Sequence, residues 1–151
     1  NGAMLIVEMA AFYKNQGKTL VDVMSELYKR FGYWNNELFN FGFEGADGMA
    51  KMLAMMDSLR TQAPAMLGGK RVVRVDDYKL STSLDVETGE KTKLDFPSSN
   101  VIVLGTENKD KVIIRPSGTE PLIRVMAEGE DEAVIAVVAN MIASVIREQL
   151  A

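Results

Sequence analysis

The chain has 151 residues, of which 47% are hydrophobic and 25% charged, a balance typical of a globular protein with one domain or one domain and part of another. It contains no cysteine and no histidine, which excludes disulfides, thiol catalysis and imidazole chemistry. The net charge of −4 argues against nucleic-acid and anionic-membrane partners, and no apolar stretch approaches the ~20 residues that span a bilayer. We therefore expect a cytoplasmic protein with neither kind of partner.

Two helices are expected at the start of the chain. Residues 3–14 have a helical composition but are apolar on nearly all sides, as in a helix that is buried in a larger protein. In the second helix, Thr19 can cap a run whose apolar residues repeat at helical spacing, and Gly32 can end it. We interpret the chain as a fragment of a longer protein.

A strand, a helix, four strands and a last helix follow. The segment YWNNELFNFGFEG reads as the first strand and Gly45–Gln62 as an amphipathic helix. Its apolar face should comprise Met49, Met52, Leu53, Met56 and Leu59. The later strands are expected at residues 71–75, 100–105, 111–115 and 122–127, with the turn of an excursion hairpin at residues 85–90 and the last helix at Asp131 to Leu150. This order predicts an α+β domain, an antiparallel sheet with helices on one face.

Three candidate sites fail on their spacing. NQGKT, residues 15–19, matches the end of a nucleotide-binding P-loop but lacks the earlier glycine and the preceding strand. Residues 85–90 have some carboxylates of a calcium loop, but the glycine is misplaced and the closing glutamate is missing. Asp76 and Asp77 are adjacent on a strand and point to opposite faces, so they cannot share a proton. We expect both to be surface charges.

The strand–turn–strand segment KVIIRPSGTEPLIRV is the strongest candidate for a binding site. Arg115 offers a planar fork that can bind two phosphate oxygens. Ser117 and Thr119 add short hydroxyl donors, and Gly118 leaves the backbone N–H groups open as an anion nest. Arg124, on the return strand, can bring a second cation near the turn. On composition alone, the same residues equally suit an ordinary hairpin turn.

The sequence IIRPSGTEPLIRVMAEG resembles the phosphate-binding loop of the α-D-phosphohexomutases, the family of phosphoglucomutase, phosphomannomutase and phosphoglucosamine mutase. FEGADGMAKMLAMMDSLR, VVRVDDY and FPSSNVIV resemble other parts of its fourth domain, most closely in the phosphoglucomutase-like branch. The resemblance implies that residues 1–36 are the helical tail of the third domain and a linker. It implies that residues 37–151 are the C-terminal phosphate-binding domain, with a fold like that of the TATA-box-binding protein: strand, helix, four strands, helix.

The resemblance also implies a parent enzyme, an intramolecular phosphotransferase of the isomerase class. Such an enzyme interconverts glucose 1-phosphate and glucose 6-phosphate through glucose 1,6-bisphosphate and holds Mg²⁺ in another domain. The matching positions Arg115, Ser117, Gly118, Thr119 and Arg124 would bind the substrate phosphate. This chain would lack the phosphoserine and metal loops, so we expect it to be inactive alone, with no catalytic residue and no bound Mg²⁺. Its partners would be a phosphorylated hexose and the remaining domains of the parent.

The identity of the sugar stays open. Leu122 stands where many phosphoglucomutases carry a lysine, and TEPLIRVMAEGEDEA is close to the phosphoglucosamine mutase version. A phosphomannomutase or phosphoglucosamine mutase domain, or a non-enzymatic module that binds phosphorylated sugars, therefore remains an alternative.

Overall fold

The computed structural model describes residues 2–130 together with Asn140 and Ser144. The chain divides into two compact units, Asn1–Trp34 and Asn35–Ala151. The assignment of the first unit to a preceding domain, with residue 36 as its end, stays a prediction.

The first unit consists of two helices, α1 (Gly2–Lys14) and α2 (Leu20–Phe31). Thr19 caps α2 as predicted, because its side chain accepts a hydrogen bond from the amide of Asp22 while the Asp22 carboxylate accepts one from the amide of Thr19. The amide of Gly32 donates to the carbonyl of Tyr28 and ends the helix. Helix α1 forms as expected, and none of its described residues is buried.

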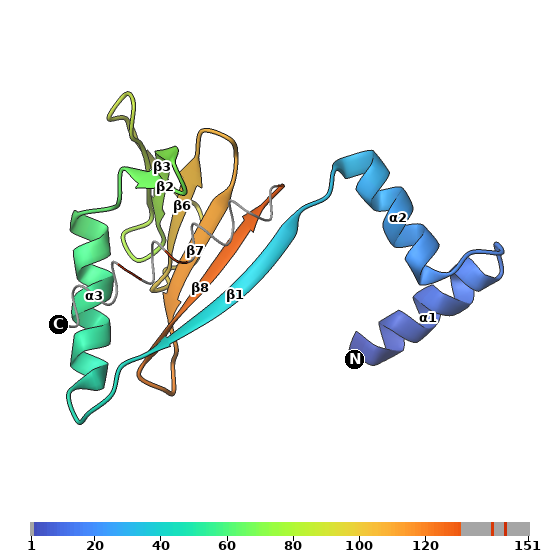
Figure 1. Cartoon of the computed structure of the whole chain (residues 1–151), viewed down its shortest axis with the longest axis horizontal. Helices are drawn as coiled ribbons and strands as arrows, with labels where there is room; N and C mark the ends of the chain where they lie inside the picture. The colour runs from blue at the N-terminus through green and yellow to red at the C-terminus, as the bar shows by residue number, and fades with distance from the viewer. Residues whose placement is uncertain (1, 131–139, 141–143, 145–151) are drawn as a thin grey trace. The chain divides into compact units, whose positions relative to one another are not determined.

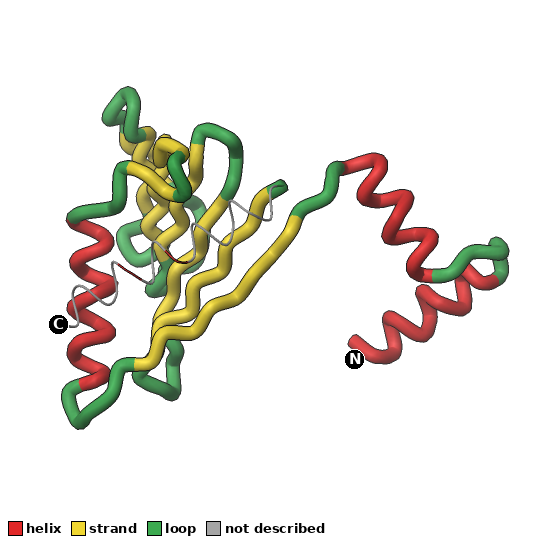
Figure 2. The backbone as a smooth tube through the Cα atoms, in the orientation of Figure 1, coloured by secondary structure: helices red, strands yellow, loops and turns green. Residues whose placement is uncertain are grey.

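The second unit is an eight-stranded antiparallel sheet with helix α3 (Gly48–Thr61) packed on one face (Figures 1 and 2). The strands run in the order β1-β8-β7-β6-β3-β4-β5, and β2 pairs with β3. Their bounds are β1 Asn35–Gly42, β2 Met66–Leu67, β3 Lys70–Asp77, β4 Thr82–Asp85, β5 Lys91–Lys93, β6 Ile102–Thr106, β7 Lys111–Pro116 and β8 Leu122–Gly129.

The observed elements confirm the predicted α+β class and the expected strand at each of the five positions. The excursion hairpin is also present, as the pair β4–β5. The last expected helix, Asp131 to Leu150, lies outside the described residues apart from Asn140 and Ser144. The likeness to the TATA-box-binding protein stays a prediction. None of the helices that the structure describes is both long and apolar enough to cross a membrane.

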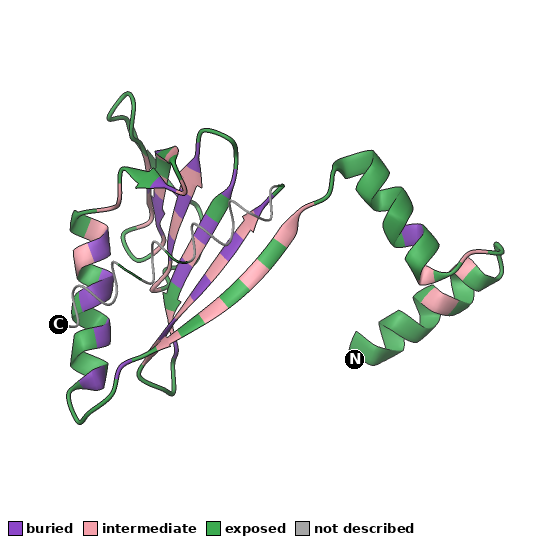
Figure 3. Ribbon diagram, viewed as in Figure 1, coloured by how far each residue is buried: buried purple, intermediate pink, exposed green. Residues whose placement is uncertain are grey.

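The core lies between α3 and the face of the sheet that α3 covers (Figure 3). Residues alternate along β7 and β8, so Ile114, Ile123 and Val125 are fully buried on this face. The predicted apolar face of α3 was wrong in part: Met49 and Leu53 are 43% and 46% exposed. The buried residues of its stripe are Met52, Met55, Met56 and Leu59. The stripe is narrower than predicted because one sheet face covers only one side of the helix.

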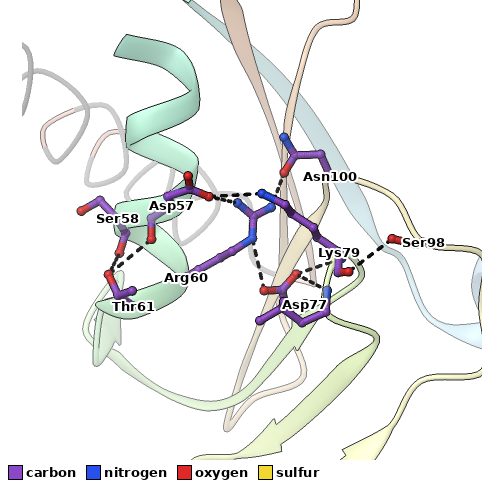
Figure 4. A network of polar contacts seen from close by, with 9 residues as sticks. Asp57, Ser58, Arg60, Thr61, Asp77, Lys79, Ser98 and Asn100 are labelled. Atoms are coloured by element: carbon purple, nitrogen blue, oxygen red, sulfur yellow. Dashed lines mark hydrogen bonds and ion pairs between the residues drawn. The ribbon is translucent and has the colours of Figure 1, made fainter. Parts of the chain in front are cut away.

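The prediction that Asp76 and Asp77 are surface charges was wrong, since each residue is only 7% exposed. Helix α3 brings Arg60 to the end of β3, where its Nε lies 3.2 Å from Asp77 Oδ2 (Figure 4). Asp76 instead pairs with Arg74, two residues earlier on the same strand, at 2.8 Å. Each carboxylate pairs with its own arginine. This pairing offsets part of the cost of burying the two carboxylates.

Candidate functional site

The loop between β7 and β8, residues 117–121, is a tight turn closed by two backbone hydrogen bonds. The amide of Ser117 donates to the carbonyl of Leu122, and the amide of Leu122 donates to the carbonyl of Glu120, both at 2.8 Å. Ser117 is 8% exposed, whereas Gly118 and Thr119 are exposed. The loop therefore holds Ser117 in place and presents the next residues to solvent.

The loop is fixed against the start of α3. The amide of Phe43 donates to the carbonyl of Pro121 at 2.8 Å. At Gly48, the first residue of α3, a side-chain carbon would collide with the carbonyl oxygen of Phe43 and lie 3.4 Å from Cβ of Pro121. The close approach of α3 to the backbone of Phe43 thus requires a glycine at position 48, next to the loop.

Two arginines stand directly opposite each other where β7 and β8 meet the loop. The register pairs Arg115 of β7 with Arg124 of β8, so both side chains lie on the face away from α3. Arg115 is exposed and Arg124 is partly buried. Neither forms an ion pair or side-chain hydrogen bond with a described residue. Like charges placed opposite each other on a sheet are destabilising, so this pair favours an anion that the described residues do not supply.

The loop adds backbone and hydroxyl donors beside the arginines. In the described part of the chain, the amides of Gly118, Thr119 and Glu120 donate no hydrogen bond, and the hydroxyls of Ser117 and Thr119 make none. No described atom lies within 4 Å of a Cβ built on Gly118, whose φ is outside the left-handed region. The missing side chain therefore leaves open space beside the free amides, and the backbone conformation itself does not require glycine.

The structure thus places all five predicted site residues at one end of the β7–β8 pair. Two guanidinium groups, three free amides and two hydroxyls are the kinds of donor that bind an oxyanion. The predicted role of these residues in binding phosphate stays a proposal. Sequence reasoning did not find Asn40, which the register places opposite Arg124 on β1. The sequence gives one sign of this residue, because Asn40 is polar and stands between the aromatic residues Phe39 and Phe41 of a strand.

A concave region lies elsewhere on the second unit and is poorly suited to an anion. A cavity of about 660 Å³ opens beside the β4–β5 hairpin, and its described lining includes four carboxylates but only two arginines. Both arginines are already neutralised: Arg71 pairs with Glu87 and Glu107, and Arg74 pairs with Asp76. Hydrogen bonds and charge from Arg71 hold the pKa of Glu107 below its usual range, so the cavity is negatively charged at neutral pH.

The residues that the structure describes do not fit a metal site. Among them, no group of three or more carboxylate, imidazole or thiol side chains is placed to hold a metal ion. We therefore assign no chemical step in this chain to Mg²⁺.

Comparison with known proteins gives consistent results. Residues 98–145 match the family model of the phosphoglucomutase/phosphomannomutase C-terminal domain. Phosphoglucomutases from Staphylococcus epidermidis and Staphylococcus haemolyticus are 32% and 33% identical to the chain over 121 residues. One from Staphylococcus aureus is 34% identical over 122 residues. Each alignment covers 80% of this chain but 22% of the relative, so the chain spans about a fifth of the length of these proteins.

A solved structure also aligns with the chain. It is the open form of the exocytosis-sensitive phosphoprotein pp63/parafusin from Paramecium, with 15% sequence identity and a TM-score of 0.47, covering 91% of this chain and 24% of that one. The family match and the curated relatives confirm the resemblance found in the loop and in the segments before it. The chain belongs to the phosphoglucomutase/phosphomannomutase family and contains that family's C-terminal domain.

Proposed function

We propose that the β7–β8 loop binds the phosphate group of a hexose phosphate, within a larger phosphoglucomutase that interconverts glucose 1-phosphate and glucose 6-phosphate through glucose 1,6-bisphosphate. The relatives that share 32–34% identity are phosphoglucomutases. Because this chain spans 22% of their length, catalysis and Mg²⁺ binding belong in this proposal to other parts of the protein. The isolated chain should therefore show no mutase activity.

The observation that best supports the proposal is the opposed pair Arg115 and Arg124, which has no counter-ion among the described residues. A phosphate dianion placed over this pair would replace the repulsion between two cations with attraction to both. The planar guanidinium of Arg115 can bind two phosphate oxygens at once. The free amides of Gly118 and Thr119 are candidates to bind a further oxygen, and the space where a side chain of residue 118 would stand is open in the described chain.

Binding at this loop would act on the reaction from a distance. In the proposed role, the five residues hold the phosphate that is not being transferred, so the sugar is oriented toward the reacting centre. Binding energy from a remote group can be used in this way to lower the barrier at the reacting atoms. In the complete enzyme, Arg115→Ala should therefore damage substrate binding and orientation together.

The test is a titration of the ¹⁵N-labelled chain with inorganic phosphate, followed by NMR. The NMR signals of the Gly118 and Thr119 amides should shift most. The dissociation constant should be ~1 mM, because a few charge-assisted hydrogen bonds must offset the cost of association. Arg115→Ala should weaken binding by about tenfold or more.

Lys111→Ala is the matched control. Lys111 is an exposed cation on the same strand and the same face, four residues from Arg115, and it stands opposite Glu128 rather than a second cation. Its removal should change the dissociation constant by less than about twofold. The proposal is wrong if the largest shifts lie outside the loop, or if the two variants weaken phosphate binding equally.

A further inference from the structure

We infer that Asn40 of β1 binds a hydroxyl group of the sugar whose phosphate is held at the β7–β8 loop. This inference rests on the proposed function, because it assumes a phosphorylated sugar in that site. It adds a residue from the edge strand, which lies far from the loop in the sequence. It also gives the site a means to distinguish a phosphorylated sugar from phosphate alone.

The register places Asn40 in one row with the two arginines. On β8, Arg124 pairs with Asn40 of β1 on one side and with Arg115 of β7 on the other. Side chains that stand directly opposite each other in antiparallel pairs lie on the same face. Asn40, Arg124 and Arg115 therefore form a continuous polar row. The row crosses β1, β8 and β7, which lie side by side in the sheet (Figure 1).

Asn40 is available for a ligand. The residue is exposed, and its side chain makes no hydrogen bond with the described residues. Strand β1 is the edge of the sheet, so none of the described strands covers the row on that side. The next β1 residues on this face are Leu38 and Gly42, neither of which has a polar side chain. Asn40 is thus the polar side chain of β1 that stands level with the arginines.

The spacing suits a sugar better than a phosphate. Neighbouring strands lie about 4.8 Å apart, so Asn40 is roughly 10 Å from Arg115 across the sheet. A phosphate held midway over the Arg115–Arg124 pair is roughly 7 Å from Asn40 across the sheet, whereas the ring of an attached hexose can extend past Arg124 and bring hydroxyls to Asn40. A side-chain amide both donates and accepts hydrogen bonds, as a hydroxyl does, so the two groups are complementary.

The experiment compares two probes on three forms of the full chain: wild type, Asn40→Ala and Asn36→Ala. Asn36 is the matched control, because it is an exposed asparagine on the same strand and face but stands opposite Glu128 instead of Arg124. The probes are inorganic phosphate and glucose 1-phosphate, each titrated by ¹⁵N NMR. Unchanged amide signals of Ile123 and Val125 would show that each variant keeps its fold.

For wild type, glucose 1-phosphate should shift the side-chain amide of Asn40 as well as the loop amides. Asn40→Ala should weaken binding of glucose 1-phosphate by about three- to tenfold, the effect of one hydrogen bond. The same variant should leave phosphate binding unchanged, and Asn36→Ala should leave both unchanged.

The outcomes separate this inference from the proposed function. If phosphate does not shift the loop amides of the wild type, the proposed function fails and the inference fails with it. If phosphate binds the loop but Asn40→Ala leaves glucose 1-phosphate binding unchanged, only the inference is overturned. An equal loss for both probes would also overturn it, since Asn40 would then act on the phosphate itself.

Discussion

Replacement of Asp77 by alanine should lower the free energy of unfolding of the second unit by more than the loss of an exposed ion pair does. Asp77 contacts both helix α3 and the turn that follows β3 (Figure 4). Its Oδ2 lies 3.2 Å from Arg60 Nε of α3, and its Oδ1 accepts hydrogen bonds from the amides of Lys79 and Leu80 at 2.9 and 3.2 Å. The side chains of Arg60 and Asp77 are only 8% and 10% exposed, so water cannot replace these contacts.

The expected loss follows from these contacts. Removing one partner of a buried ion pair costs about 3–5 kcal/mol, because the remaining charge is left buried. Arg60 keeps its ion pair with Asp57 at 2.8 Å and its contact with Asn100, which offsets part of this cost. Two amides lose their acceptor as well, and each net hydrogen bond is worth roughly 1 kcal/mol. If the partial offset and the two lost hydrogen bonds roughly cancel, the free energy of unfolding should fall by about 3–5 kcal/mol.

Urea unfolding of the full chain, followed through the amide NMR signals of Val112 and Ile123, would measure this loss in the second unit. Lys51→Ala is the control, because it removes the Lys51–Asp47 pair, whose side chains are 47% and 62% exposed. The control should cost at most about 0.5 kcal/mol. If Asp77→Ala costs no more than the control, the interpretation of Asp77 as a buried structural anion is refuted.

Two further predictions concern other close contacts. A side chain at Gly129 would collide with the carboxylate of Asp110, which Lys70 and Thr106 hold at 3.0 and 3.1 Å. Gly129→Ala should therefore lower the free energy of unfolding by about 1–3 kcal/mol in the same urea assay, and a loss below ~0.5 kcal/mol would contradict the packing. In α2, hydrogen bonds from the side chain and amide of Thr19 hold the pKa of Asp22 below its usual range. The stabilisation of the folded unit by these hydrogen bonds is complete at neutral pH and is lost as the pH falls through the lowered pKa of Asp22. Thr19→Ala should raise the pKa of Asp22 in an NMR titration, whereas Ser25→Ala should not, and equal values in both variants would exclude the capping role.

Elements with strong local signals could be predicted from the sequence. The Thr19 cap, the stop at Gly32 and the apolar runs of β7 and β8 each depend on a few neighbouring residues. The hairpin turn at residues 85–90 could be predicted, but the bounds of strands β2 and β5 could not, since one has two residues and the other, KTK, is polar and exposed. They form because their backbones pair with β3 and β4, and no local sequence pattern indicates that pairing.

The errors have a shared cause, which is tertiary contact. Asp77 has the composition of a surface residue, and its burial depends on Arg60, which comes from a helix in another layer. Met55 is buried in place of Met49 because the position of the sheet decides which side of α3 is covered. The candidate site shows the same contrast between features set by local sequence and features set by tertiary contact. The donors of the loop could be predicted because they are adjacent in sequence, but the place of Asn40 depends on the pairing of β1 with β8.

The same register that buries the core fixes the polar row of the site. Ile114, Val125 and Phe39 form the neighbouring row across β7, β8 and β1, on the opposite face. A slip of one residue would move these apolar side chains into solvent. Burying each one stabilises the fold by roughly 1.5–3 kcal/mol, whereas like charges on opposite strands cost less than about 1 kcal/mol. The sheet can therefore keep Arg115 and Arg124 opposed without a counter-ion among the described residues, so the proposed site would already be formed when an anion arrives.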